Sequence, residues 1–249
     1  MRTLRLTIAY DGADFAGWQL QANSRTVQGV IEDALRELSG AALRPVAAGR
    51  TDSGVHAAGQ VLSLDLPGEV TLPLKAFVHG LNRLLPEDVA ILDAAEAEPG
   101  FDARRDAQSK HYRYRVLNRP TRHPLLRRTH WLVHPPLAIA PMREAAAKLV
   151  GDHDFAAFRA SDCQAKTTVR RIDRFDLESG AVDEWFFDVE GTAFLKHMVR
   201  NLVGTLVEIG LGQRSPDDIE RLIATRDRRL SGRTAPAHGL TLIAVKYAR

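Results

Sequence analysis

The residues best suited to chemistry lie in one run at positions 48–57, A-G-R-T-D-S-G-V-H-A. The run places one carboxylate, Asp52, two residues from one guanidinium, Arg50. Gly49 and Gly54 permit a tight bend, and the small residues around them leave room for a bulky substrate group. A nearby arginine keeps such a carboxylate ionised. The run therefore indicates a carboxylate nucleophile, with an Asx turn or a helix-capping aspartate as the alternative.

Residues in two other segments could act together with that carboxylate. An apolar segment predicted as a helix over 194–209 sets Lys196 and Arg200 one turn apart, where a half-buried Arg200 can pair with Asp52. The alternative is a solvated stripe on an amphipathic helix. Tyr112 lies in a predicted strand and offers a stacking surface or a phenolic hydrogen bond to a flipped-out base, although sheet packing explains Tyr112 and Tyr114 equally well.

Composition and missing motifs exclude several classes of protein. The chain has 249 residues, 45% of them hydrophobic and 26% charged, which is typical of a globular protein. No apolar run is long enough to span a bilayer and the start lacks a signal-peptide core, so we expect a cytoplasmic protein without membrane contact. The single cysteine, Cys163, excludes an intrachain disulfide. Phosphate-loop, dinucleotide, G-x-S-x-G and H-E-x-x-H motifs are absent, and Asp152-His153-Asp154 is too sparse for a metal site. We expect no cofactor and no metal.

The distribution of positive charge favours a nucleic-acid partner. The formal net charge is +3 and the isoelectric point is about 9.2. Arginine suits bidentate contacts to phosphate, and grouped arginines are the usual electrostatic mark of nucleic-acid binding. Solvated faces are the alternative. The groups comprise Arg104 and Arg105; Arg113, Arg115 and Arg119; Arg122, Arg127 and Arg128; Arg170, Arg171 and Arg174; and Arg226, Arg228, Arg229 and Arg233.

The predicted strands and helices that must position these residues occur in two similar series along the chain. Apolar periodicity predicts strands where it alternates and helices where it recurs every three or four residues. The first series gives a strand at 4–9, a helix at 27–38 ending at Gly40, a strand at 61–66 and a helix at 74–85. The second gives strands at 111–116, 171–177, 185–189 and 240–247, and helices at 141–150, 194–209 and from 215. The pattern predicts an α+β protein with a largely antiparallel sheet and halves at 1–105 and 106–249.

Seven motifs in order resemble the tRNA pseudouridine synthase A family, and they cover nearly the whole chain. The run at 48–57 is the most specific of them, because it matches the family's G-R-T-D-x-G-V-H signature. The others are 10–19 (Y-D-G with F-A-G-W-Q), Thr26-Val27-Gln28, 101–114 (F-x-A-R followed by K-x-Y-x-Y), 151–155 (G-D-H-D-F), 194–204 and His238-Gly239-Leu240.

The resemblance implies a pseudouridine synthase fold, with two similar halves forming a central antiparallel sheet flanked by helices. The half at 1–105 would carry the catalytic loop and the half at 106–249 would complete the cleft. Asp52 would be catalytic, and the substrate-binding residues would be Tyr112, Arg50, Arg200 and Leu240. The activity implied is isomerisation of uridine to pseudouridine at positions 38, 39 and/or 40 of the tRNA anticodon stem-loop, without a cofactor, by a homodimer.

One departure and several alternatives accompany this interpretation. Asp102 stands where the family often has His, which would weaken a phosphate contact there. Asp52 could attack C1′ of the ribose, attack C6 of the base, or assist a glycal-like intermediate. A non-catalytic RNA-binding or tRNA-chaperone module is the first rival function. A glycosidase is the second, and it would need a paired carboxylate for which the sequence offers no candidate.

Overall fold

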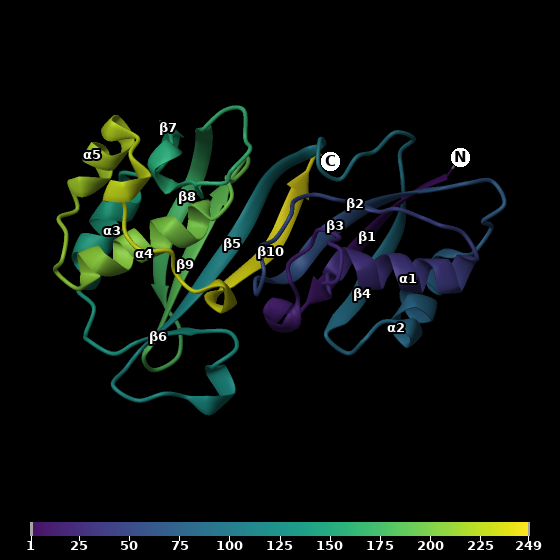
Figure 1. Ribbon diagram of the computed structural model, residues 1–249, viewed down its shortest axis with the longest axis horizontal. Coiled ribbons are helices and arrows are strands. Elements are labelled where there is room, and N and C mark those ends of the chain that lie inside the picture. The colour runs from purple at the N-terminus through teal and green to yellow at the C-terminus, as the bar shows by residue number, and fades with distance from the viewer. Residues whose placement is uncertain (1, 249) are drawn as a thin grey trace. The chain divides into compact units, whose positions relative to one another are not determined.

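The computed structural model describes residues 2–248, which form an α+β fold with mostly antiparallel strands (Figure 1). The predicted α+β class is confirmed. Two compact units make up the chain: unit 1 comprises Met1–Gln108 with Leu242–Arg249, and unit 2 comprises Ser109–Thr241. The last strand therefore passes from unit 2 into unit 1 at Leu242.

Unit 1 is a sheet with helices packed on one face. Its strands follow the order β4 (Val89–Ala97), β1 (Arg2–Tyr10) and β3 (His56–Leu66), with β10 (Leu240–Tyr247) beside β3 and the short β2 (Val46–Ala47) also paired to β3. Antiparallel register sets Leu4 opposite Leu64 and Leu6 opposite Leu62, all of them almost fully buried. Helix α1 (Val27–Ser39) begins at Thr26, whose hydroxyl accepts the Gly29 N–H, and ends at Gly40 with φ 72°. The capping residues explain why this helix is predictable.

Unit 2 also combines a mostly antiparallel sheet with helices. Its strands run in the order β5 (Ala107–Asn118), β9 (Glu184–Gly191), β8 (Val169–Ser179) and β7 (Gly151–Asp154), and β6 (Trp131–Val133) pairs in parallel with β5. The helices are α3 (Ile139–Ala147), α4 (Met198–Gly210) and α5 (Asp218–Thr225). Large fully buried side chains fill the core, among them Tyr114, Phe155, Phe158 and Phe187.

Short helical turns connect these elements. They are Gly12–Asp14, Pro124–Leu126, Ala156–Phe158, Arg228–Leu230 and Ala237–Gly239. The helix predicted over 74–85 contains a π-helical turn, Ala76–Gly80, before α2 (Leu81–Leu84). Leu85 is extended, as the following proline requires. Among residues 2–248, no helix combines the length and apolar character needed to cross a membrane.

The structure differs from the prediction at the start of one helix and in one strand that is not predicted. The helix predicted from 194 starts only at Met198, because His197 takes φ 62°, outside the helical region. Lys196 therefore precedes α4 and is not one helical turn from Arg200. The strand β4 is absent from the prediction, since its sequence V-A-I-L-D-A-A-E-A is rich in alanine, which favours helix.

Candidate active site

Asp52 occupies the tip of the loop that joins β2 to β3 in unit 1. The Val55 N–H donates to the Asp52 carbonyl at 3.1 Å and closes a turn in which Gly54 has φ 79°. The Asp52 side chain is partly buried, between buried Thr51 and exposed Ser53. The predicted glycine-dependent bend is therefore present, and its carboxylate is sheltered but reachable.

A second segment, residues 10–18, holds this loop on both sides of Asp52. The Trp18 N–H donates to the Thr51 carbonyl at 3.1 Å. On the other side of the carboxylate, the Gly54 N–H and the Ser53 hydroxyl both donate to the Phe15 carbonyl, at 3.3 and 3.1 Å. The backbone before and after Asp52 is thus fixed by hydrogen bonds to residues that lie far back in the sequence.

This close approach depends on two glycines in the second segment. Gly17 has φ 99°, and a Cβ there would lie 2.9 Å from the Thr51 carbonyl oxygen. At Gly12 a Cβ would collide with the Val55 carbonyl oxygen. Only glycine allows the two backbones to meet at both positions.

Buried polar side chains fix the loop from the sheet side. The Tyr10 hydroxyl lies 2.8 Å from the Thr51 hydroxyl, and the Gln60 amide donates to the Gly49 carbonyl at 2.8 Å. Burial raises the pKa of Tyr10 to about 12, although hydrogen bonds with Thr51 and Gln60 partly oppose the shift. The phenol therefore stays neutral and remains a fixed hydrogen-bonding partner at neutral pH. The sequence alone does not reveal these supporting residues, because only the folded sheet brings them to the loop.

Arg50 behaves differently from the expectation that it pairs with Asp52. Its side chain is exposed, and within residues 2–248 its guanidinium has no hydrogen-bond or ion-pair acceptor. The proposed contact between Arg50 and Asp52 is therefore not formed in this structure. A role for Arg50 in binding substrate stays a prediction.

The other three predicted site residues, Tyr112, Arg200 and Leu240, belong to unit 2. Tyr112 lies on β5 opposite Val189 and packs edge-to-face on Phe194, with ring centroids 5.3 Å apart. Arg200 lies in the first turn of α4, and its Nε donates to the Ala235 carbonyl at 2.8 Å. It is half-buried, so the solvated-stripe alternative does not describe it. Leu240 is buried at the start of β10.

Tyr114 is a structural residue. It is fully buried, and its hydroxyl donates to the Pro236 carbonyl at 2.7 Å. Gly239 lies against its ring so closely that a Cβ there would be 2.5 Å from the ring. The sheet-packing interpretation therefore holds for Tyr114.

Several of the grouped arginines are neutralised by carboxylates. Arg113 makes a bidentate contact with Asp188, at 3.0 Å from Nε and 2.9 Å from Nη2, and Asp188 is 1% exposed. Similar pairs join Arg171 to Asp152 and Asp173, Arg174 to Asp176, Arg226 to Asp154, and Arg229 to Asp227. Arg228 instead donates to Asn201, Ser231, Gly232 and Thr234, a network that binds its loop to α4.

Asp102 also has a structural role. Its carboxylate accepts the N–H groups of Arg104 and Arg105, both at 2.9 Å, and lies 3.1 Å from the Arg105 Nε. Burial alone would raise the pKa of Asp102, but these donors outweigh it and the pKa is lowered. The departure from the family pattern therefore provides a turn cap.

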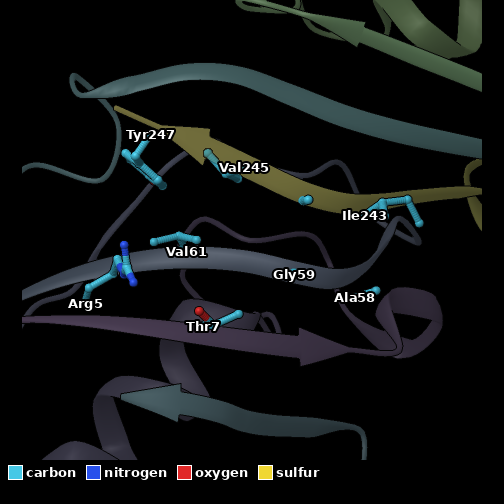
Figure 2. A pocket seen from close by; sticks show the side chains of 9 residues that line it. Arg5, Thr7, Ala58, Gly59, Val61, Ile243, Val245 and Tyr247 are labelled. Atoms are coloured by element: carbon cyan, nitrogen blue, oxygen red, sulfur yellow. The ribbon is translucent and has the colours of Figure 1, made fainter. Parts of the chain in front are cut away.

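The sheet of unit 1 also carries a hollow. Figure 2 shows it between β1, β3 and β10, and none of the five predicted site residues lines it. It is bordered by Arg5, Thr7, Ala58, Gly59, Val61, Ile243, Ala244, Val245 and Tyr247. Within residues 2–248, no three His, Cys, Asp or Glu side chains converge on a point where a metal ion could bind.

Comparison with known proteins identifies a family whose members this chain resembles. A family model described as tRNA pseudouridine synthase matches residues 6–104 and 145–248. A tRNA pseudouridine synthase A from Myxococcus xanthus is 53% identical over 247 residues, covering 99% of this chain and 92% of that protein. One from Pelobacter propionicus is 50% identical, covering 99% and 100%. Among solved structures, the archaeal box H/ACA sRNP Nop10-Cbf5 complex aligns at 11% identity with a TM-score of 0.37, covering 82% of this chain and 42% of that one.

Proposed function

Because the chain belongs to the tRNA pseudouridine synthase family, we propose that it isomerises uridine to pseudouridine in tRNA, at positions 38, 39 and/or 40 of the anticodon stem-loop. The observation that carries this proposal is the Asp52 loop. Its carboxylate is partly buried at the tip of a turn whose backbone is hydrogen-bonded on both sides. A group that must attack one carbon atom benefits from being held in this way before substrate arrives.

Asp52 is the proposed nucleophile. The reaction breaks the bond between C1′ of the ribose and N1 of the base, turns the uracil, and joins C1′ to C5. C5 gives up a proton and N1 gains one, so the product has the same atoms as the substrate. A temporary bond from Asp52 to the nucleotide is released at the end, which regenerates the carboxylate.

The target base has to leave its stack to reach Asp52. We assign Tyr112 and Leu240 to the surface against which the flipped base rests, and this role is supported by their fixed, largely apolar surroundings. Arg200 and Arg50 are assigned to the phosphates or to the charge of the reacting centre. In this proposal residues 1–105 supply the catalytic loop, and residues 106–249 complete the cleft.

The remaining parts of the proposal concern assembly and location. We propose that the chain acts as a homodimer on tRNA in the cytoplasm, with no cofactor and no metal. The chemistry just described needs no redox partner and no group donor, because the product is an isomer of the substrate and the proton lost from C5 is balanced by the one gained at N1. Gel filtration with light scattering tests the dimer.

Removal of the Asp52 carboxylate tests the function. Unmodified tRNA transcripts are incubated with wild type, Asp52→Ala and Asp52→Asn, and pseudouridine is measured by position. We expect anticodon-arm pseudouridine from wild type and a loss of at least about 10⁴-fold in both variants, with tRNA binding kept. A wild type that binds tRNA tightly but forms no pseudouridine would instead support the non-catalytic RNA-binding module.

A further inference from the structure

We propose that residues 119–128 of unit 2 form a docking loop for the RNA backbone, in which Arg122 and Arg127 contact phosphates and Leu125 packs against a ribose or base. This inference rests on the proposed function, since it concerns the same RNA substrate. It is carried by the charge, the exposure and the internal hydrogen bonds of this one loop, called the docking loop below.

The docking loop lies in the longest stretch of the chain without acidic residues. Between Asp106 and Glu144 the sequence contains no Asp or Glu but eight Lys and Arg residues. Where the fold brings no carboxylate from elsewhere to such positive charge, it attracts a polyanion and produces binding that weakens with salt.

In the described part of the chain, Arg122 and Arg127 of the docking loop lack the close carboxylate partner that several other exposed arginines have. Arg122 is exposed, and within residues 2–248 it has no hydrogen-bond or ion-pair acceptor. Arg127 is exposed too, and it donates to the neutral carbonyl of Pro124 at 3.1 Å. Arg119 reaches only to 4.0 Å from Asp183. In contrast, Arg171, Arg174 and Arg229 contact carboxylates at 2.6–2.9 Å.

The tip of the docking loop presents an apolar side chain to solvent. Leu125 is 86% exposed in the turn Pro124–Leu126. The turn is ordered by its own backbone, since the Leu126 N–H donates to the His123 carbonyl and the His130 N–H donates to the Leu126 carbonyl. Leu125 is ordered but contributes nothing to the core, and it lies between Arg122 and Arg127, which have no carboxylate partner among residues 2–248. This arrangement fits contact with the apolar face of a nucleotide.

The base of the docking loop is anchored to the sheet of unit 2. The Arg119 N–H donates to the Val133 carbonyl, and the Asn118 amide donates to the same carbonyl at 2.9 Å. In Figure 1 this teal segment extends away from the strands beside β6. Such an arrangement keeps the tip accessible while its root stays fixed.

Salt dependence of tRNA binding tests the docking loop. We compare wild type with Arg122→Gln/Arg127→Gln, with Leu125→Ala, and with the control Arg36→Gln, whose arginine is exposed but paired with Asp33 at 2.9 Å. Affinity for one unmodified tRNA transcript is measured from about 50 to 200 mM salt, the range over which phosphate contacts weaken most visibly, and pseudouridine formation is measured alongside. Thermal melts show that each variant is folded.

We expect the double variant to bind about tenfold more weakly and to reduce the slope of log K against log salt by about 1.4–1.8, for two lost phosphate contacts. Leu125→Ala weakens binding severalfold with an unchanged slope, because no charge is removed. Arg36→Gln changes neither quantity.

A folded double variant with wild-type affinity and slope overturns the proposal, and assigns the loop to a different partner such as an acidic protein. An unchanged affinity for Leu125→Ala overturns the apolar contact. Absence of pseudouridine from wild type itself would count against the proposed function, and so is distinct from both results.

Discussion

The Asp52 loop and the docking loop are built in opposite ways. The Asp52 loop is contacted by Trp18, Phe15, Tyr10 and Gln60, and its glycine neighbours admit another backbone at close range. The docking loop is hydrogen-bonded at its root and within its own turn, and its tip is exposed. A catalytic group has to be held in one position, whereas groups that dock a flexible polyanion have to keep their charge available. The difference predicts which loop tolerates substitution.

Crowding at Gly12 is expected to produce the largest effect. A Cβ at this position collides with the Val55 carbonyl oxygen, so Gly12→Ala must displace the end of the catalytic loop or the turn that contains Gly12. We expect a loss of about 2–3 kcal/mol in the free energy of unfolding and, since a misplacement of about 1 Å costs on the order of 100-fold, a similar fall in kcat. Urea unfolding and single-turnover assays measure both.

Gly40→Ala is the matched control. Gly40 has φ 72°, but no atom lies within 4 Å of the place that a Cβ would take, so the substitution costs only the left-handed backbone. That cost is about 1–2 kcal/mol. We expect kcat to be unchanged. Equal loss of kcat in the two variants would mean that general destabilisation, and not displacement of the Asp52 loop, limits activity.

Tyr10→Phe is expected to have a smaller effect, because it removes the hydroxyl that lies against Thr51 without opening a cavity or displacing the backbone. The loss is about 1 kcal/mol in the free energy of unfolding, with a severalfold lower kcat and a nearly constant KM. The Tyr10 hydroxyl lies 2.8 Å from the Thr51 hydroxyl, so Thr51→Ser should keep the contact and much of the activity. A large rise in KM without a change in kcat would contradict a positioning role.

The same tyrosine gives a pH dependence with a definite sign. Burial raises the pKa of Tyr10 to about 12, from 10.0 in the unfolded chain. The neutral phenol is thus favoured by folding, so its contribution is complete below about pH 10 and is lost as the pH rises towards about 12. The difference in unfolding free energy between wild type and Tyr10→Phe should fall by about 2–3 kcal/mol over this interval. A constant difference across the same interval would show that Tyr10 is not held in a buried site.

The contrast between the loops also explains which features of the site can be predicted from the sequence and which cannot. The position of the Asp52 loop is predictable because Gly49, Asp52 and Gly54 lie within one run, and a glycine bend is a local property. Its anchoring by Phe15 and Trp18 is not, since those hydrogen bonds join residues far apart in the sequence. Helix α1 is predictable for the local reason, because Thr26 and Gly40 cap it.

Errors arise where long-range contacts override a local pattern. The apolar pattern at 194–197 continues into α4, but the Lys196 carbonyl accepts the Ala160 N–H and His197 turns out of the helix. The arginine groups look alike in sequence, whereas only strand register shows that Arg113 meets Asp188, 75 residues away. Charge that is neutralised across a sheet cannot be distinguished from available charge by counting residues.

Arg229→Gln is expected to have the smallest effect. It tests whether an arginine that is already paired with a carboxylate contributes to tRNA binding. Arg229 is 88% exposed, yet its guanidinium makes contacts of 2.6–3.1 Å with both oxygens of Asp227. The hydrogen bond from the Arg229 side chain is the main cause that lowers the pKa of Asp227 to about 2. Substitution should return this pKa towards 3.8, which NMR titration of the carboxyl can follow.

Because Arg229 is already neutralised by Asp227, the affinity of the variant for tRNA should change less than twofold, and the slope of log K against log salt should stay constant. A slope reduced by about 1, as for a phosphate contact, would mean that paired arginines bind RNA as well as those of the docking loop do, and the distinction between the two kinds of arginine would fail.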